Sequence, residues 1–322
     1  MEEKNVEYAP KPKAGEPWNV VIIGSGPASL TAAIYTARGA ASTVILAGEK
    51  WGGQLMLTTD VDNFPGFPES IQGPELMQKM RKQTERFGAE FIERNVEAVD
   101  FSKKPFELIA DGQKYLANSV IIATGAETRW LGVPREDKLR GRGVSSCASC
   151  DAPLFKNKKV VVVGGGDSAM EEALVLIKYA DSVTIIHRRN ELRASKAMQK
   201  KIFDNKKIKI LWNTEVVEVV GNEKLEKIVL KNNETRQKTE MFVDGVFVAI
   251  GHTPSTKIFK NHIKLDEKGY VVVHDQTKTN IPGIFVAGDV HDYWYKQAVT
   301  AAGFGCMAGM DALKYLEKRL TK

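Results

Sequence analysis

Cysteine is scarce in this sequence, which holds only Cys147, Cys150 and Cys306 among 322 residues. Three cysteines are too few for a scaffold held together by disulfides. They are also too few for structural zinc, which takes about four ligands, because the five histidines include no close H-x₃₋₅-H pair. We therefore expect no metal site.

Long apolar runs are also missing. None approaches the roughly 18 residues that a membrane-spanning helix needs, so we expect no membrane association. Residues 1–17 are polar, contain three prolines and lack the apolar stretch of a secretory signal, which predicts a flexible tail and a cytoplasmic protein. The net charge of +6 arises from basic residues scattered among 40 acidic ones, so it does not predict nucleic-acid binding.

One structural unit occurs twice in the chain. A short apolar strand at 19–23 leads into a glycine turn at 24–29, then a helical pattern and a second apolar strand, and the same order recurs from residue 159. This order predicts a βαβ unit, and the near-continuous hydrophobicity of the strands indicates a buried parallel sheet. The two turns begin 140 residues apart (164 − 24), which fits two domains.

Further strands define how the domains are connected. Three more strand-and-turn segments close the two sheets, at 119–125, 245–251 and 283–289. A helical pattern then runs from about Gln297 to the C-terminus. We predict an α/β fold of two Rossmann-like dinucleotide-binding domains, one inserted into the other. The outer domain would comprise residues 18–128 and 255–322, and the inserted domain residues 129–254.

The first glycine turn predicts a dinucleotide site. A helix N-terminus presents unpaired N–H groups and partial positive charge, which suit a pyrophosphate. Gly24 allows the tight turn, Gly26 lets the phosphate approach bare backbone, and Ser29 takes the third small position, where the fingerprint has Gly. The ribose-binding acid expected about 20 residues later is not clearly present. Glu49 is equally well this ligand or a surface carboxylate.

The second turn repeats the fingerprint in Gly164, Gly165, Gly166, Asp167, Ser168 and Ala169. The strand that follows ends in His187, Arg188 and Arg189, with Arg193 close behind. An acid here would bind the 2′-hydroxyl of NAD, whereas arginines favour the 2′-phosphate of NADP. The alternative is a solvated basic helix start. At this strand end, we expect His187 to contact the cofactor.

The C-x-x-C pair, Cys147 and Cys150, lies shortly before the second fingerprint. Zinc binding, an inert chance pair and a redox dithiol are the alternatives. We favour the dithiol, because this spacing permits a small disulfide ring and a depressed thiol pKa. Asp151 is either a general acid or a helix-turn carboxylate, and its adjacency to the pair favours catalysis. Cys306 lies in a small-residue helical run, which predicts a packed core cysteine.

The surroundings of the pair predict a short helix. Ser145 or Ser146 would cap it and place Cys147 near its positive end. Pro153 would limit this helix to one or two turns.

Taken together, the motifs resemble the low-molecular-weight thioredoxin reductases from about Val20 to Leu316. They are GSGPA at 24–28, GEKWGGQL at 48–55, DNFPGF at 62–67, ATGA at 123–126, CASCD at 147–151, GGGDSAMEEA at 164–173, HRRNELR at 187–193, AIGHTP at 249–254, VAGDV at 286–290 and YKQAVTAAGFGCMA at 295–308. The resemblance implies a homodimer in which NADPH reduces FAD, FAD reduces the Cys147–Cys150 disulfide, and the dithiol reduces thioredoxin. It also implies that Cys150 faces the flavin and that Cys147 attacks the partner.

The resemblance further implies which residues contact FAD. They are Gly24, Ser25, Gly26, Pro27, Ala28, Gly48, Glu49, Gly52, Gly53, Gln54, Asn63, Ala123, Thr124, Gly125, Gly288, Asp289, Lys296, Gln297 and Ala298. A helix starting near Gln297 would stabilise negative charge on the pyrimidine edge of reduced flavin. The family usually has Arg where this chain has Lys296, which keeps the charge but loses the planar fork. Trp51 adds a bulky side chain to the loop before Gly52, and the sequence does not indicate its effect.

Three other functions compete with this one. Reduced ferredoxin or another flavin cofactor would replace NADPH as donor, but the three arginines argue against this. A ferredoxin–NADP reductase of related architecture would not need the cysteine pair. A non-catalytic nucleotide sensor would not need activated thiols.

The cycle also predicts motion between the domains. The dithiol and the nicotinamide would both lie on the inserted domain, and the flavin on the other domain. They can take turns at one flavin only if the inserted domain rotates. The two chain connections near Glu127–Arg129 and Thr253–Thr256 would form the hinge.

Overall fold

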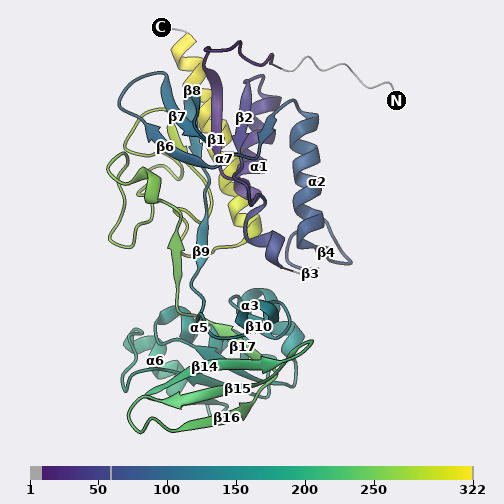
Figure 1. Ribbon diagram of the computed structural model, residues 1–322, viewed down its shortest axis with the longest axis vertical. Helices are drawn as coiled ribbons and strands as arrows, with labels where there is room; N and C mark the ends of the chain where they lie inside the picture. The colour runs from purple at the N-terminus through teal and green to yellow at the C-terminus, as the bar shows by residue number, and fades with distance from the viewer. Residues whose placement is uncertain (1–8, 59, 321–322) are drawn as a thin grey trace. The chain divides into compact units, whose positions relative to one another are not determined.

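The computed structural model describes residues 9–58 and 60–320, and it divides into two compact units (Figure 1). Unit 1 comprises Met1–Glu127 and Thr253–Lys322, and unit 2 comprises Thr128–His252. The boundaries predicted from the sequence differ from these by one or two residues. Residues 1–8 of the predicted tail lie outside the described residues, and residues 9–17 contain no helix or strand.

Unit 1 is built on a seven-stranded sheet in the order β5-β2-β1-β8-β7-β6, with β19 also paired to β8. Its strands are β1 (Trp18–Ile23), β2 (Thr43–Leu46), β5 (Glu90–Ile92), β6 (Val96–Asp100), β7 (Phe106–Ala110), β8 (Gln113–Ile122) and β19 (Ile284–Val286). The strands β1, β2, β5, β8 and β19 are parallel, and β6 and β7 add an antiparallel edge. Val20 and Ile22 join one core and Val21 and Ile23 another, so both faces of the sheet are covered.

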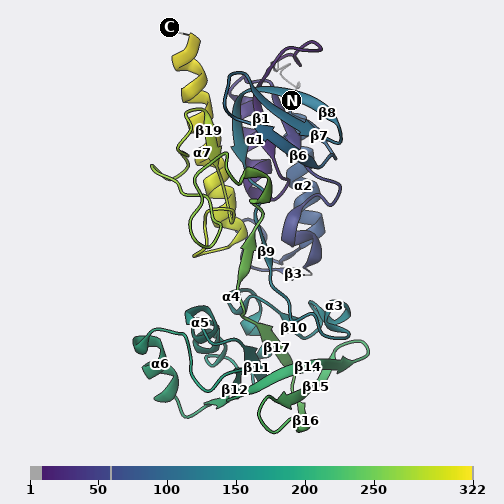
Figure 2. The same ribbon diagram turned by 60° about the vertical axis from the view of Figure 1, so that its left-hand side comes forward.

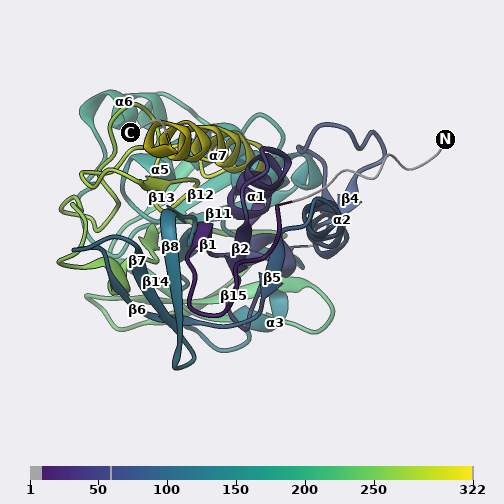
Figure 3. The same ribbon diagram turned by 90° about the horizontal axis from the view of Figure 1, so that it is seen from above.

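Helices cover one face of this sheet: α1 (Pro27–Arg38), α2 (Gly73–Arg86) and α7 (Ala298–Leu320). In Figures 2 and 3 the long α7 runs beside α1. Glycine permits this close approach, because a Cβ on Gly305 would lie 2.1 Å from the Ala28 carbonyl oxygen and one on Gly309 would lie 3.0 Å from that of Ala32. The small-residue run near the C-terminus therefore serves helix packing.

Unit 2 has three layers. A five-stranded parallel sheet in the order β10-β17-β11-β12-β13 forms the centre. Its strands are β10 (Val144–Ser145), β11 (Lys159–Val163), β12 (Ser182–Ile186), β13 (Ile208–Leu211) and β17 (Gly245–Val248). The helices α5 (Asp167–Leu176) and α6 (Lys196–Phe203) cover one face. An antiparallel sheet of β14 (Thr214–Gly221), β15 (Leu225–Asn232) and β16 (Lys238–Phe242) covers the other.

The chain connects the units twice, through β9 (Ala126–Thr128) and β18 (His252–Pro254), which pair with each other. The shorter elements are η1 (Gly53–Leu57), β3 (Asp60–Val61), β4 (Ile71–Gln72), α3 (Glu136–Leu139), α4 (Ala148–Asp151), η2 (Ala152–Phe155) and η3 (Lys257–Phe259). Across the described residues, no helix combines the length and apolarity needed to cross a bilayer. The predicted fold class, with one Rossmann-like unit inserted into another, is confirmed.

Candidate dinucleotide and dithiol sites

The first glycine turn leaves bare backbone at the start of α1. Gly24 has φ +111°, and a Cβ there would lie 2.3 Å from the Ala123 carbonyl oxygen, so only glycine fits. Gly26 is the N-cap of α1, and a Cβ on it would meet no atom within 4 Å. Pro27 follows at the first helical position, where its missing N–H costs nothing. The space in front of Gly26 is therefore open to a ligand.

Two serine hydroxyls fasten this turn. Ser29, which departs from the glycine fingerprint, is fully buried and donates a hydrogen bond to the Gly24 carbonyl oxygen (2.5 Å). Ser25 donates to the Ala47 carbonyl oxygen (2.8 Å) and accepts the N–H of Gly52 (2.9 Å). The hydroxyl of Ser25 thus ties the second glycine loop to the first.

The loop containing Gly52 and Gly53 approaches the turn closely. Both glycines have positive φ, and a Cβ on Gly53 would lie 3.5 Å from the Cα of Gly26. Gly48, also at positive φ, begins the loop, while Gln54 is exposed within η1. Glu49 is exposed, and its backbone N–H is bound by the Asn95 side chain (3.2 Å). Contact of these residues with FAD stays a prediction.

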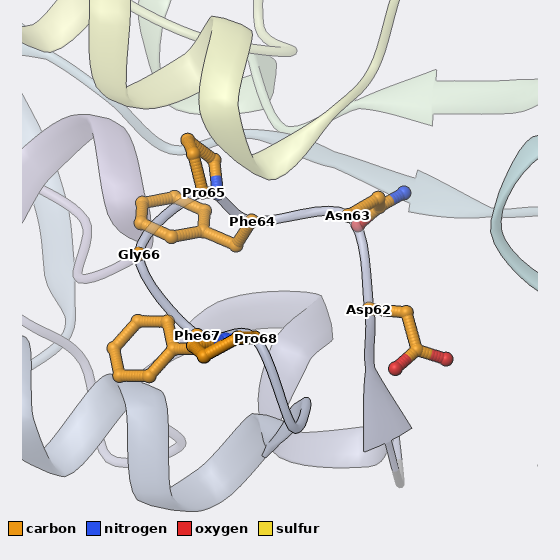
Figure 4. Close-up of a pocket in the computed structure, with 7 residues that line it drawn as sticks. All are labelled: Asp62, Asn63, Phe64, Pro65, Gly66, Phe67 and Pro68. Carbon is orange, nitrogen blue, oxygen red and sulfur yellow. The ribbon is translucent and has the colours of Figure 1, made fainter.

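Two distant predicted residues meet in unit 1. The Asn63 amide donates to the side-chain oxygen of Gln297 (3.3 Å), across 234 residues of sequence. Asn63 belongs to a hollow lined by residues 62–68, shown in Figure 4, where the rings of Phe64 and Phe67 point away from the Asn63 side chain. The helix predicted to start near Gln297 begins at Ala298.

Asp289 is a partly buried carboxyl group three residues after β19. Its pKa is raised to about 7, mainly by burial and also by the neighbouring Asp292, while Lys296 lowers it. Such a carboxyl exchanges its proton near neutral pH, so it can accept from or donate to a ligand hydroxyl. The preceding Gly288 has positive φ and lies against Ala28 of α1.

Lys296 is held by its own loop. Asp292 accepts the backbone N–H groups of Trp294, Tyr295 and Lys296 at 2.9–3.3 Å, which folds the loop into a tight turn. The Lys296 ammonium donates to the Tyr293 carbonyl oxygen (2.8 Å). The Lys296 ammonium therefore lies on the loop just before α7, but it binds a backbone carbonyl group of that loop.

The second glycine turn repeats this geometry. A Cβ on Gly164 would lie 2.4 Å from the Ala249 carbonyl oxygen and one on Gly165 would lie 2.1 Å from the His187 ring. A Cβ on Gly166, the N-cap of α5, would meet no atom within 4 Å. Asp167 and Ser168 are exposed in the first turn of α5.

The buried ring of His187 contacts the backbone of this turn. Its Nδ1 lies 3.1 Å from the Gly164 carbonyl oxygen and its Nε2 lies 2.9 Å from that of Glu191, and the ring is buried beside Trp212. Both ring nitrogens therefore face backbone. The predicted contact of His187 with the cofactor remains untested, and the geometry gives the ring a supporting role.

The arginine segment folds back onto the same turn. The backbone N–H groups of Arg193 and Ala194 donate to the Gly165 carbonyl oxygen at 2.7 and 3.1 Å, and the N–H of Ser195 donates to the Asp167 carboxylate (2.8 Å). Arg188, Arg189 and Arg193 are exposed. In the part of the chain that the structure describes, none of the three forms an ion pair.

Two asparagines that the motifs did not single out hold this segment. Asn233 donates through its side chain to the Arg188 carbonyl oxygen (3.1 Å), and the Asn213 N–H donates to that of Arg189 (3.2 Å). The Asn233 N–H also donates to the Asn213 carbonyl oxygen (2.6 Å). No spacing pattern marks these contacts, which join loops distant in sequence.

Cys147 and Cys150 are joined by a disulfide bond. Cys147 is the N-cap of α4, which is only four residues long and passes into η2 at Ala152, so the predicted short helix is confirmed. The predicted cap by Ser145 or Ser146 is wrong, because Cys147 itself is the N-cap and makes no side-chain cap bond; the Ser145 hydroxyl instead accepts the N–H of Cys147 (3.1 Å). Cys150 is exposed and Cys147 is half-buried.

Asp151 is linked to the cysteines through Ser145. The Ser145 hydroxyl donates to the Asp151 carboxylate (2.5 Å) while accepting the Cys147 N–H. Burial raises the pKa of Asp151, and the hydrogen bond from Ser145 lowers it. A partly buried carboxyl group of this kind retains a proton at higher pH than an exposed one, which suits a general acid.

Cys306 corrects one prediction. It forms no disulfide and is half-buried on α7, where its thiol lies 3.9 Å from the Met310 sulfur. A hydrogen bond with Cys306 raises the pKa of Tyr35 on α1. The expected packed core position is therefore wrong, because the buried face of α7 is the one that carries Gly305 and Gly309.

Comparisons with known proteins agree with the resemblance read from the motifs. Residues 18–305 match the pyridine nucleotide-disulphide oxidoreductase family. The chain is 50% identical over 304 residues to the thioredoxin reductase of Rickettsia prowazekii, covering 93% of this chain and 98% of that protein. The thioredoxin reductase structure from Streptococcus pyogenes is 41% identical with a TM-score of 0.89, covering 94% and 98%.

A further solved relative is the thioredoxin reductase of Lactococcus lactis in a form titled FR conformation, which is 40% identical, covers 94% and 99%, and has a TM-score of 0.64. These matches imply an enzyme that uses a flavin and a nicotinamide nucleotide. The chain belongs to the pyridine nucleotide-disulphide oxidoreductase family.

Proposed function

We propose that this enzyme is an NADPH-dependent thioredoxin reductase that uses FAD and the Cys147–Cys150 disulfide. The observation that carries the proposal is the disulfide itself, which is linked through Ser145 to a carboxyl group of raised pKa and lies in the unit with the arginine-flanked glycine turn. The thioredoxin reductases among the relatives support the choice of protein substrate.

FAD fits the first glycine turn. The open space at Gly26 would admit the pyrophosphate, and the unpaired N–H groups of α1 would bind it. Asp289, with its pKa near 7, would bind a ribityl hydroxyl, and the Asn63–Gln297 pair together with the N-terminus of α7 would hold the flavin ring. When bound, FAD would carry two electrons from a nicotinamide nucleotide to disulfide sulfur.

NADPH fits the second turn. Gly166 would admit its pyrophosphate, as Gly26 would for FAD. Arg188, Arg189 and Arg193 would bind the 2′-phosphate. The backbone bond to Gly165 holds Arg193 beside the turn, and Asn233 and Asn213 hold the backbone of Arg188 and Arg189.

The dithiol would act on the partner by thiol–disulfide exchange. The Cys147 thiolate attacks one sulfur of the thioredoxin disulfide, forming a mixed disulfide and releasing the other sulfur as a thiolate. The Cys150 thiolate then attacks the Cys147 sulfur, which restores the Cys147–Cys150 disulfide and releases reduced thioredoxin. Asp151 would hold the proton that the cysteine sulfurs exchange as they open and close.

Rotation of unit 2 would connect the half-reactions. The dithiol and the NADPH turn belong to the same unit, so they reach the flavin in turn only if that unit moves. The connections at β9 and β18 would form the hinge. Two relatives of nearly equal identity support this, since their TM-scores are 0.89 and 0.64 and the second is titled FR conformation. A crosslink pinning the units would allow one half-reaction and block turnover, and full turnover would contradict rotation.

A homodimer would form through the outer faces of α1 and α7. Tyr35, Val299, Met307 and Met310 are 36–44% exposed, and the three residues on α7 recur at helical spacing, which makes an apolar stripe. Met310→Lys should convert the dimer into monomers in analytical ultracentrifugation. We place the enzyme in the cytoplasm, where thiols are kept reduced.

Anaerobic titration tests the function. NADPH should reduce the bound flavin and then thioredoxin, and NADH should do so poorly. Cys147→Ser and Cys150→Ser should keep flavin reduction but lower thioredoxin reduction to background, while Cys306→Ser should retain turnover. Turnover in either variant of the pair would refute the assigned dithiol.

A further inference from the structure

Trp51 has an anchored ring. It directly precedes Gly52 and Gly53, the two glycines that approach the first glycine turn. Its ring packs edge-on against Phe91 of β5, with centroids 5.6 Å apart. The guanidinium of Arg81 on α2 lies 4.9 Å from the Trp51 ring and 3.9 Å from the Phe91 ring. One cation thus covers two aromatic rings.

Arg81 is itself fixed in place. Its Nε binds the Glu85 carboxylate (2.9 Å) and its NH1 binds that of Glu93 (2.7 Å). Glu85 of α2 and Glu93 of the loop after β5 bind the guanidinium, which lies near both rings. Arginine suits this arrangement because its planar group stacks and forms directed hydrogen bonds at the same time.

The loop needs such an anchor. Gly52 and Gly53 have φ of +92° and +66°, and glycine loses more conformational freedom than any other residue when it is ordered. The Ser25–Gly52 hydrogen bond holds one side of the loop at the turn. The Trp51 ring holds the other side on the α2–β5 surface.

We propose that the stack of Trp51, Arg81 and Phe91 keeps the Gly52–Gly53 loop closed over the first glycine turn, which makes Trp51 and Arg81 positioning residues for FAD. The inference rests on the proposed function, in which FAD occupies this turn. Without the stack, the glycines sample open conformations, and bound FAD escapes more often. The stack acts through the loop and needs no contact with the cofactor.

The test is the rate at which the holoenzyme releases FAD, followed by the rise in flavin fluorescence after dilution. Trp51→Ala and Arg81→Met should each release FAD about tenfold faster, the scale of a partly desolvated cation–π contact. Trp51→Phe keeps a ring and should stay within about twofold of wild type. Arg86→Met is the matched control, because Arg86, the last residue of the same helix, lies over the Phe87 ring (4.7 Å) instead of the Trp51 ring.

Two further measurements separate positioning from general stability. The double variant Trp51→Ala/Arg81→Met should release FAD no faster than the faster single variant, because the residues act as one unit. The apoprotein of each variant should melt near the wild-type temperature. The inference would be overturned if the single variants released FAD at the wild-type rate. It would also be overturned if a substitution lowered the melting temperature of the apoprotein as much as that of the holoenzyme. A wild-type protein that binds no FAD would refute the proposed function instead.

Discussion

Replacing both Arg188 and Arg189 with Ala is the most direct test of the segment that contains the three arginines. The measured quantity is the preference of the enzyme for NADPH over NADH. The segment is tied to the Gly165 carbonyl oxygen by two backbone hydrogen bonds and by Ser195 to Asp167. These bonds involve only backbone donors on the segment side, so they survive the substitutions. The variant should therefore keep its glycine turn and lose only the two cationic side chains.

The magnitude follows from the charge-assisted bonds that are lost. Each such bond to a phosphate contributes about 1.5–3 kcal/mol, and exposed side chains fall at the lower end because solvent screens them. Two bonds then amount to about 3 kcal/mol, which is about a 100-fold fall in the preference for NADPH over NADH. Arg193→Ala alone should lower the preference about tenfold.

The assay compares kcat/KM for flavin reduction with the two nucleotides at one ionic strength. NADPH should weaken through KM, and NADH should be nearly unchanged. Titration with 2′,5′-ADP measures the phosphate contact without any electron transfer. An equal loss for NADPH and NADH would show that the arginines support the fold rather than the phosphate, and would refute the NADP assignment.

Three other predictions follow from the sites. If protonated Asp151 is the acid, turnover should fall as pH rises through its raised pKa. Ser145→Ala removes the hydrogen bond that lowers the pKa of Asp151, so this fall should move to higher pH. An unchanged pH profile would contradict this role. Gly24→Ala should lower the free energy of unfolding of unit 1 by more than about 2 kcal/mol, which calorimetry measures. Gly26→Ala should keep the wild-type melting temperature and lose FAD, which the flavin content of the purified protein measures. Asn233→Ala should raise KM for NADPH about three- to tenfold and spare NADH, and an equal rise for both would refute positioning of Arg188 by Asn233.

Local chemistry explains what could be predicted from the sequence. Glycine at the two turns is required by short-range geometry, since the carbonyl oxygens of Ala123 and Ala249 occupy the space of a Cβ. Apolar strands buried on both faces leave a continuous run, as at 19–23 and 159–163. Both signals lie within a few residues of the element that they predict.

The missed features depend on distant segments. The Ser25–Gly52 bond spans 27 residues and the Asn233–Arg188 bond spans 45, and neither leaves a periodic pattern. Trp51 meets its partners only because α2 and β5 pack beside its loop. The burial of Cys306 could not be read from its small-residue run, because its thiol is only half-buried and lies beside Tyr35 of α1 and Met310 of its own helix.

The two glycine turns share one design but differ in what surrounds them. In each, a backbone carbonyl group blocks a Cβ at the first glycine, Gly24 or Gly164, and the glycine two residues later, Gly26 or Gly166, leaves open space at a helix N-terminus. Over the first turn, Ser25 and the Trp51 stack hold a second glycine loop. At the second, the flanking arginine side chains are exposed. A loop fastened beside the first turn suits a cofactor that stays bound through many cycles, and exposed arginines beside the second suit a nucleotide that must leave after each hydride it delivers. These surroundings fit the proposal that FAD is the resident group and NADPH the exchanging one.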